Sequence, residues 1–126
     1  MPYMGLGDDA FKAISAKTAA YQVLPGDHGK IFTNRGASAS VTFTLPNTAD
    51  IQTGWNCRFF VVANHAVVIA SYGSSDDISA FNDATADSIT IDTSAERIGF
   101  GCEVVWDGTS WLAFVNQGET QTITIA

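Results

Sequence analysis

The stretch HGKIFTNRGASASVTFTLP, residues 28–46, sets the expected fold class of this chain of 126 residues. Its second half alternates between apolar and hydroxyl-bearing side chains, in the order Val41, Thr42, Phe43, Thr44 and Leu45. Successive side chains of a β-strand point to opposite faces, so this pattern predicts a strand with one buried apolar face and one face of hydroxyls. The glycines earlier in the stretch predict turns.

The start of the same stretch contains residue types that also occur in catalytic and phosphate-binding sites. Its glycine spacing does not match a phosphate-binding loop, and an isoleucine follows Lys30 where that loop needs a Ser or Thr to bind Mg²⁺. Adjacent strand residues point to opposite faces, so Asp27 and His28 are not expected to form a catalytic pair. We therefore predict a turn at residues 25–27 that carries no catalysis.

Strand patterns continue along the rest of the chain, at residues 55–63, 66–72, 88–92, 98–106 and 120–125. The second half of the first of these is apolar on both faces, at Phe60 and Val62, so we expect it to be covered on both sides. A turn at Asn64 and His65, the latter a solvated turn residue, is expected to bring residues 66–72 back as the returning strand.

A tight turn is predicted at Asp107 and Gly108, because Asp-Gly between two strand patterns is a strong hairpin signal. Residues 71–87 are read as a long irregular segment. Short strands separated by turn residues predict an all-β chain, either an antiparallel β-sandwich or a barrel-like domain. The strand pattern at the end of the chain is expected to add to a sheet edge, its own or a neighbour's.

The first 20 residues differ from the rest and predict a short extended or helical N-terminal arm, residues 1–20, before a β domain at residues 21–126. Asp8 or Asp9 is a candidate cap for one helical turn, which would place two apolar residues three apart on one side. The candidate partner-binding residues of the arm are its apolar side chains: Tyr3, Met4, Leu6, Phe11 and Ile14.

Three further groups of residues have a structural and a functional interpretation. Cys57 and Cys102 are read as buried free thiols, with a disulfide left open if their strands are neighbours. Trp55, Trp106 and Trp111 are the candidates for a platform on which a sugar stacks. Trp106 and Trp111 flank the predicted hairpin turn, where cross-strand packing is the commoner role. A solvated acidic surface is preferred over a calcium site for five acidic residues: Asp76, Asp77, Asp83, Asp87 and Asp92.

Charge and motif content exclude several function classes. Thirteen acidic residues against six basic ones give a net charge of -7, which repels phosphate backbones, so no nucleic-acid partner is expected. The longest apolar run, residues 59–63, is too short to cross a bilayer, so no membrane partner is expected. The sequence contains no metal-ligand spacing, cofactor motif or nucleophile elbow. We therefore expect the protein to bind no metal and no cofactor, and to have no enzymatic activity.

The segments HGKIFTNRGA, VTFTLP and VVWDGTSW, within residues 21–115, resemble the small β domains of tailed-bacteriophage structural proteins. Such domains occur in capsid decoration (cement) proteins and in tail-fibre or tail-tip proteins. The sequence has no heptad shaft and no collagen-like repeat, and its short arm before one β domain looks more like a decoration protein.

That resemblance implies a structural protein of the virion, made in the host cytoplasm and placed on the outer capsid surface. It implies the major capsid protein as partner and a homo-oligomer, with a trimer favoured. The alternative is a tail-fibre or tail-tip module that binds host surface glycans through Trp106, Trp111 or Tyr72.

Overall fold

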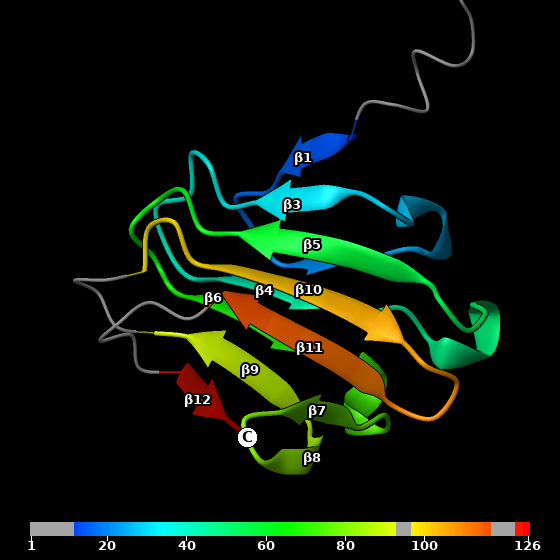
Figure 1. Ribbon diagram of the computed structural model, residues 1–126. Helices are drawn as coiled ribbons and strands as arrows, with labels where there is room; N and C mark the ends of the chain where they lie inside the picture. Colours follow the sequence, from blue (N-terminus) through cyan, green and yellow to red (C-terminus); the bar gives the residue numbers. More distant parts are fainter. Residues whose placement is uncertain (1–11, 93–96, 117–122) are drawn as a thin grey trace, which may run out of the picture.

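The computed structural model describes residues 12–92, 97–116 and 123–126 (Figure 1). These residues form strands β1 (Ile14–Ala16), β2 (Tyr21–Gln22), β3 (Ile31–Thr33), β4 (Val41–Thr44), β5 (Asn56–Phe60), β6 (Val67–Ala70), β7 (Ile78–Ala80), β8 (Asp83–Ala86), β9 (Ser88–Ile91), β10 (Gly101–Trp106), β11 (Trp111–Asn116) and β12 (Ile123–Ile125). They also form three short 3₁₀ helices, η1 (Pro25–Asp27), η2 (Thr48–Asp50) and η3 (Tyr72–Ser74). The predicted β-rich fold is confirmed. None of the helices in this part of the chain is long and apolar enough to cross a membrane.

The strands form two sheets, and the first half of the chain alternates between them. The seven-stranded sheet has the order β1-β3-β5-β10-β11-β7-β8, and the five-stranded sheet has the order β12-β9-β6-β4-β2 (Figure 1). From β1 to β6 each successive strand therefore joins the other sheet. Strands of this segment that are neighbours in a sheet run parallel: β1 pairs with β3, β3 with β5, β2 with β4, and β4 with β6.

The predicted antiparallel arrangement is wrong for these pairs, and both sheets are mixed. The predicted return of residues 66–72 beside the preceding strand is also wrong, because β6 pairs with β4 and β9 of the five-stranded sheet. Period-two alternation shows which face of a strand is buried, but it carries no information on which strand lies beside it. The β10–β11 hairpin, by contrast, is present as predicted, and Trp106 pairs with Trp111 across its turn.

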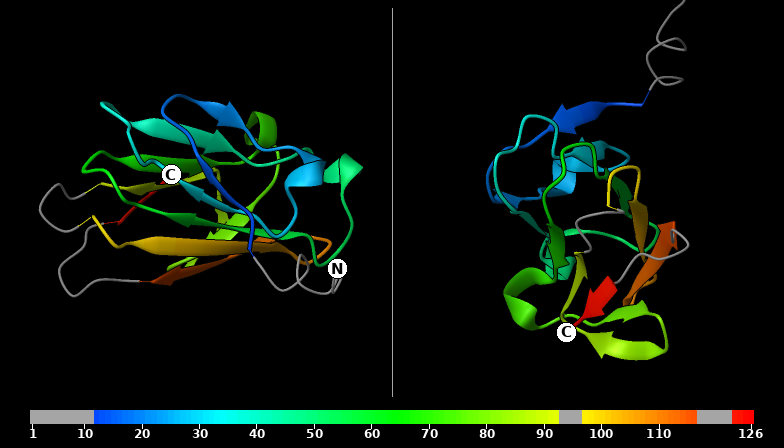
Figure 2. Two further views of the ribbon diagram at one scale, coloured as in Figure 1. Left: turned by 90° about the horizontal axis from the view of Figure 1, so that it is seen from above. Right: turned by 90° about the vertical axis from the view of Figure 1, so that its left-hand side faces the viewer.

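The hydrophobic core contains buried residues of both sheets. Figure 2 shows strands of the two sheets in separate layers. The ring of Phe43, on β4, lies 5.5 Å from that of Phe32 and 5.0 Å from that of Phe59, both on the seven-stranded sheet. All three side chains are at most 1% exposed. The apolar face predicted for residues 41–45 therefore contacts the other sheet through aromatic rings.

Both ends of the described chain lie at sheet edges. Strand β1 is the edge of the seven-stranded sheet next to β3, and β12 is an edge of the five-stranded sheet next to β9. The strand pattern at the end of the chain thus adds to the chain's own sheet. The segment read as irregular, residues 71–87, contains the antiparallel pair β7–β8, whose turn places Phe81 and Asn82 at positive φ.

Candidate functional site

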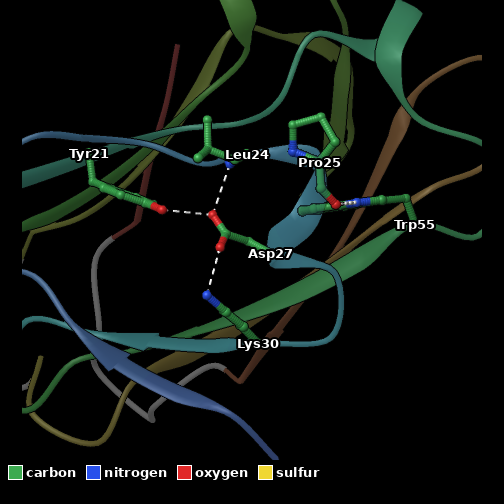
Figure 3. Close-up of polar contacts among 6 residues, drawn as sticks. All are labelled: Tyr21, Leu24, Pro25, Asp27, Lys30 and Trp55. Carbon is green, nitrogen blue, oxygen red and sulfur yellow. Dashed lines mark hydrogen bonds and ion pairs between the residues drawn. The ribbon is translucent and has the colours of Figure 1, made fainter.

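Asp27, at the end of η1, is a buried carboxylate held by three donors (Figure 3). Its Oδ2 accepts hydrogen bonds from the Tyr21 hydroxyl at 2.8 Å and from the Leu24 backbone N–H at 2.9 Å. Its Oδ1 is paired with the Lys30 ammonium at 2.8 Å. The residue is only 4% exposed, so these contacts replace water around the charge.

The pKa values of this cluster follow from its contacts. Burial acts to raise the pKa of Asp27, but the hydrogen bonds from Lys30, Leu24 and Tyr21 outweigh it and hold that pKa below its ordinary value. Burial, the hydrogen bond to Asp27 and the charge of that carboxylate raise the pKa of Tyr21 to about 12. The cluster is therefore most stable with Asp27 ionised and Tyr21 protonated.

The predicted turn at residues 25–27 is confirmed, and the structure adds a role that the sequence did not show. The donors of Asp27 come from β2, from the start of η1 and from the segment that leads into β3. Trp55 joins the same turn, because its Nε1 donates to the Pro25 carbonyl at 2.8 Å (Figure 3). The cluster ties chain segments together, and its carboxylate oxygens are already occupied by donors of this chain.

Acid is expected to destabilise the protein through Asp27. A folded-state pKa below the unfolded value of about 3.9 stabilises the fold above that pH, and this contribution is lost as the pH falls through the folded pKa. The advantage of the wild type over Asp27→Asn in urea unfolding should therefore shrink between about pH 5 and pH 2. Tryptophan fluorescence at several pH values measures it, and an advantage that stays constant over this range would contradict the assignment.

Alkali is expected to act through Tyr21 with the opposite sign. A folded pKa of about 12 lies above the ordinary value of 10.0, so the stabilisation is complete below pH 10 and is lost as the pH rises toward 12. Tyr21→Phe cannot ionise, and its stability relative to the wild type should improve over this range. Equal slopes for the two proteins in alkaline urea titrations would show that Tyr21 is not the titrating group.

Asn34 is a second buried polar residue, with no exposed surface. Its Oδ1 accepts from the backbone N–H groups of Val62 and Ala63 at 2.8 and 2.9 Å. Its Nδ2 donates to the carbonyls of Ala63 and His65 at 3.0 and 3.4 Å. One side chain thus satisfies the backbone where the chain crosses from β5 to β6, which is an architectural role.

The tryptophans are packed against one another. The ring of Trp111 lies 5.8 Å from that of Trp55 and 5.5 Å from that of Trp106. Trp111 has no exposed surface, and the other two are less than a tenth exposed. Cross-strand packing is confirmed, and Trp111 offers no face on which a sugar can stack. Of the three residues named for glycan binding, Tyr72 is the exposed one, at 41%.

A hollow of about 480 Å³ lies beside the Asp27 turn and is lined by residues of η1, of η2 and of the segment before β5. The rings of His28 and Trp55 lie 5.9 Å apart at this place. The Nδ1 of His28 accepts from the Asn56 backbone N–H at 3.2 Å, so this histidine helps to hold its own loop. Asp27 and His28 share no hydrogen bond.

The remaining candidate groups take structural positions. Cys57 and Cys102 are buried free thiols, as predicted. They lie on the neighbouring strands β5 and β10, and burial raises the pKa of Cys102 to about 12. Within the described ranges no three His, Cys, Asp or Glu residues gather where they could hold a metal ion. Of the acidic residues, Asp83 accepts from the backbone N–H of Thr85, and Asp76 from the hydroxyl of Thr48.

The candidate partner-binding residues of the arm are mostly outside the described part of the chain, which leaves out Tyr3, Met4, Leu6 and Phe11. Ile14 is described, and it lies in strand β1 rather than in the predicted helical turn. Its backbone pairs with Ile31 of β3, and its side chain is 68% exposed. The predicted arm, residues 1–20, thus contains an edge strand with an exposed apolar side chain.

The two sheets differ in the chemistry of their outer faces. The five-stranded sheet presents Thr42 and Thr44 outward, as the alternation predicts. The seven-stranded sheet presents Phe60, 42% exposed, and Phe114, 58% exposed. The expected cover over Phe60 is therefore wrong for the described single chain.

No family model matches the chain, and no curated protein matches it.

Proposed function

We propose that the chain is a capsid decoration protein, which binds the outer surface of a bacteriophage head and bridges subunits of the major capsid protein. In this proposal the two sheets pack face to face as a β-sandwich, and the bound protein is a homo-oligomer. The sandwich is the rigid scaffold, and its edges and apolar surfaces make the contacts. The protein acts by binding, without cofactor, metal or catalysis.

The resemblance to phage structural domains supports this proposal through residues that build the scaffold. Asn34 and Phe43 both lie within the resembling segments. Asn34 binds the backbone between β5 and β6, and Phe43 packs against the other sheet. The third segment forms the β10–β11 hairpin, where Asp107 accepts from the backbone N–H groups of Thr109 and Ser110 at 2.8 Å. The resemblance therefore supports the proposal at the level of the fold. The proposed role has to be argued from the surfaces of the domain.

Strand β1 is the observation that carries the role. It is three residues long, lies at the edge of the seven-stranded sheet and exposes Ile14. An edge strand presents unpaired backbone N–H and C=O groups, which a strand of another protein can extend. The apolar residues Tyr3, Met4, Leu6 and Phe11 precede β1 in the sequence, so a partner bound at this edge is close to them along the chain.

Ile14→Ser should weaken binding to capsids at least about tenfold, because the apolar contact at the edge is lost. Ile98→Ser is the matched control, since Ile98 is similarly exposed, at 62% against 68%, but lies outside β1. Deletion of residues 1–11 leaves β1 in the chain and tests the preceding segment separately. Binding is measured by co-sedimentation with expanded heads stripped of this protein, with circular dichroism as the folding control.

Heads saturated equally by Ile14→Ser, the truncated chain and the wild type would overturn the edge as the contact. The copy number in purified virions, measured by mass spectrometry against the major capsid protein, tests the role itself. Hundreds of copies are expected of a decoration protein. A few copies would favour the tail-fibre or tail-tip alternative, in which the exposed Tyr72 is the aromatic residue available for glycans.

A further inference from the structure

The outer face of the seven-stranded sheet is organised in rows that cross five strands. One row contains Ile14, Ile31, Arg58, Glu103 and Phe114, which are paired in turn from β1 to β11. The next row contains Ala16, Thr33, Phe60, Gly101 and Asn116. Side chains of one row share a face because paired residues of neighbouring strands point the same way.

Most of the uncharged side chains of this face are apolar or small, and one ion pair lies at its centre. Arg58 and Glu103 are directly opposite each other, and their Nε and Oε2 atoms lie 3.4 Å apart. They are the charged members of the two rows, and their charges cancel. The whole chain has a net charge of -7, so this neutral face is where another copy meets least repulsion. Exposed apolar patches rimmed by polar groups mark interaction surfaces.

We propose that this face binds a second copy of the same chain around a twofold axis. The axis runs parallel to the strands, in the plane of contact, between β5 and β10. A rotation of 180° about it places β5 of one copy over β10 of the other, and β3 over β11. The inference does not rest on the proposed role in capsids.

The central contacts of this pairing are complementary in charge. Arg58 and Glu103 exchange places under the rotation, so each Arg58 lies over Glu103 of the second copy. Phe60 and Gly101 are also paired across β5 and β10, so each Phe60 lies over the glycine of the second copy. A hollow of about 290 Å³ lies there, lined in part by Gly101, Phe60 and Phe114. Within one chain the Phe60 ring already lies beside this position, because a Cβ added to Gly101 would be 3.5 Å from its Cδ2, so the ring of each copy packs beside the glycine of both chains.

The flanking contacts are apolar on both sides. Ile31 on β3 and Phe114 on β11 belong to the same row, so the rotation places each over the other residue of the second copy. Phe114, 58% exposed in the single chain, becomes covered. The cover that the sequence predicts over Phe60 is supplied by another molecule.

The size of the face sets the expected strength. Five strands about 4.8 Å apart and about five residues long give each copy roughly 350 Å² in projection. Standard interfaces bury about 800 Å² of accessible surface per partner, so this face is small and we expect a weak dimer that forms toward the upper end of the concentrations tested below. A twofold pairing closes with two copies, in contrast to the trimer that the resemblance favours.

The test is sedimentation of the full chain between about 1 µM and 1 mM. The wild type should shift with concentration from the monomer mass of 13.4 kDa to twice that value. Phe114→Ser should weaken this association at least about tenfold. Phe81→Ser is the matched control, because Phe81 is 45% exposed but lies in the β7–β8 turn.

A charge exchange tests the axis itself. Arg58→Glu alone and Glu103→Arg alone each bring four like charges together at the centre, so each variant should remain monomeric. Mixed together they should form a dimer, because the acidic face of one variant meets the basic face of the other. The exposed pair contributes little to folding, and circular dichroism checks that both variants are folded.

Several results would overturn the proposal. These are a monomeric wild type at 1 mM, a trimeric wild type, an association unchanged in Phe114→Ser, or a mixture of charge variants that stays monomeric. A monomeric wild type whose Phe114→Ser variant loses binding to capsids would assign the face to the capsid protein instead. Dimerisation without any capsid binding would contradict only the proposed function.

Discussion

Replacement of Phe43 by alanine is expected to lower the free energy of unfolding by about 3–5 kcal/mol, the usual cost of removing a buried phenyl ring. The effect should be at the high end because the ring contacts Phe32 and Phe59 of the other sheet, and the cavity would open between the sheets. Urea unfolding followed by tryptophan fluorescence measures it. For a domain whose net stability is typically 5–15 kcal/mol, this loss brings the chain close to unfolding.

Phe81→Ala is the control, since it removes the same ring from a turn where the side chain is 45% exposed. We expect a change within about 1 kcal/mol. The dependence of the free energy on urea concentration should remain the same, so that the midpoints can be compared. Equal losses in the two variants would mean that the ring of Phe43 does not join the sheets.

Asn34→Ala is expected to cost about 3 kcal/mol although it removes only three side-chain atoms. The backbone N–H groups of Val62 and Ala63 lose their acceptor, and two carbonyls lose their donor, at a residue with no exposed surface. A buried polar group left unsatisfied costs about 1–3 kcal/mol. Hydrogen exchange should report the loss locally, with both amides exchanging faster than those of the central strand β10.

Asn34→Asp separates the donor from the acceptor. The carboxylate can still accept from the two backbone N–H groups, but it faces the Ala63 carbonyl, to which the amide donates. Protonation restores a donor, so the stability difference from the wild type should narrow as the pH falls below about 5. A gap that widens on acidification would show that the amide donor is not needed.

The strands that the sequence predicts well are those with one buried face. Residues 41–45 and the β10–β11 hairpin follow from alternation and from Asp-Gly, which are local signals. The order of the strands within a sheet cannot be predicted from such local signals. Strand β4, for example, lies beside β6, and its residue Val41 pairs with Val67, 26 positions later. Strand direction and sheet membership depend on these distant partners.

The polar clusters were missed for a related reason. Asn34 follows a strand and precedes Arg-Gly, a sequence typical of a solvent-exposed turn. The three residues with which it makes four hydrogen bonds lie about 30 positions later. Asp27 was placed in a turn correctly, but its contact with Tyr21 depends on where β2 runs. The spacing of Asp27 and Lys30 was the one local signal of the ion pair. The sequence shows that positions 60 and 62 are apolar, but it does not show that Phe60 is exposed in the single chain.

The winding of the first six strands has a consequence for how the chain reaches its fold. Ile14 and Ile31 are 17 positions apart, and Ile31 and Arg58 are 27 apart, whereas Trp106 and Trp111 are separated by only five. Closing long loops costs entropy before any contact is gained, so chains of high contact order fold slowly. We therefore expect the β10–β11 hairpin to form first and β5 to pair with β10 next. We expect the N-terminal strands to add after them, and β1, a three-residue edge strand, to open first, so that its amides exchange faster than those of β10.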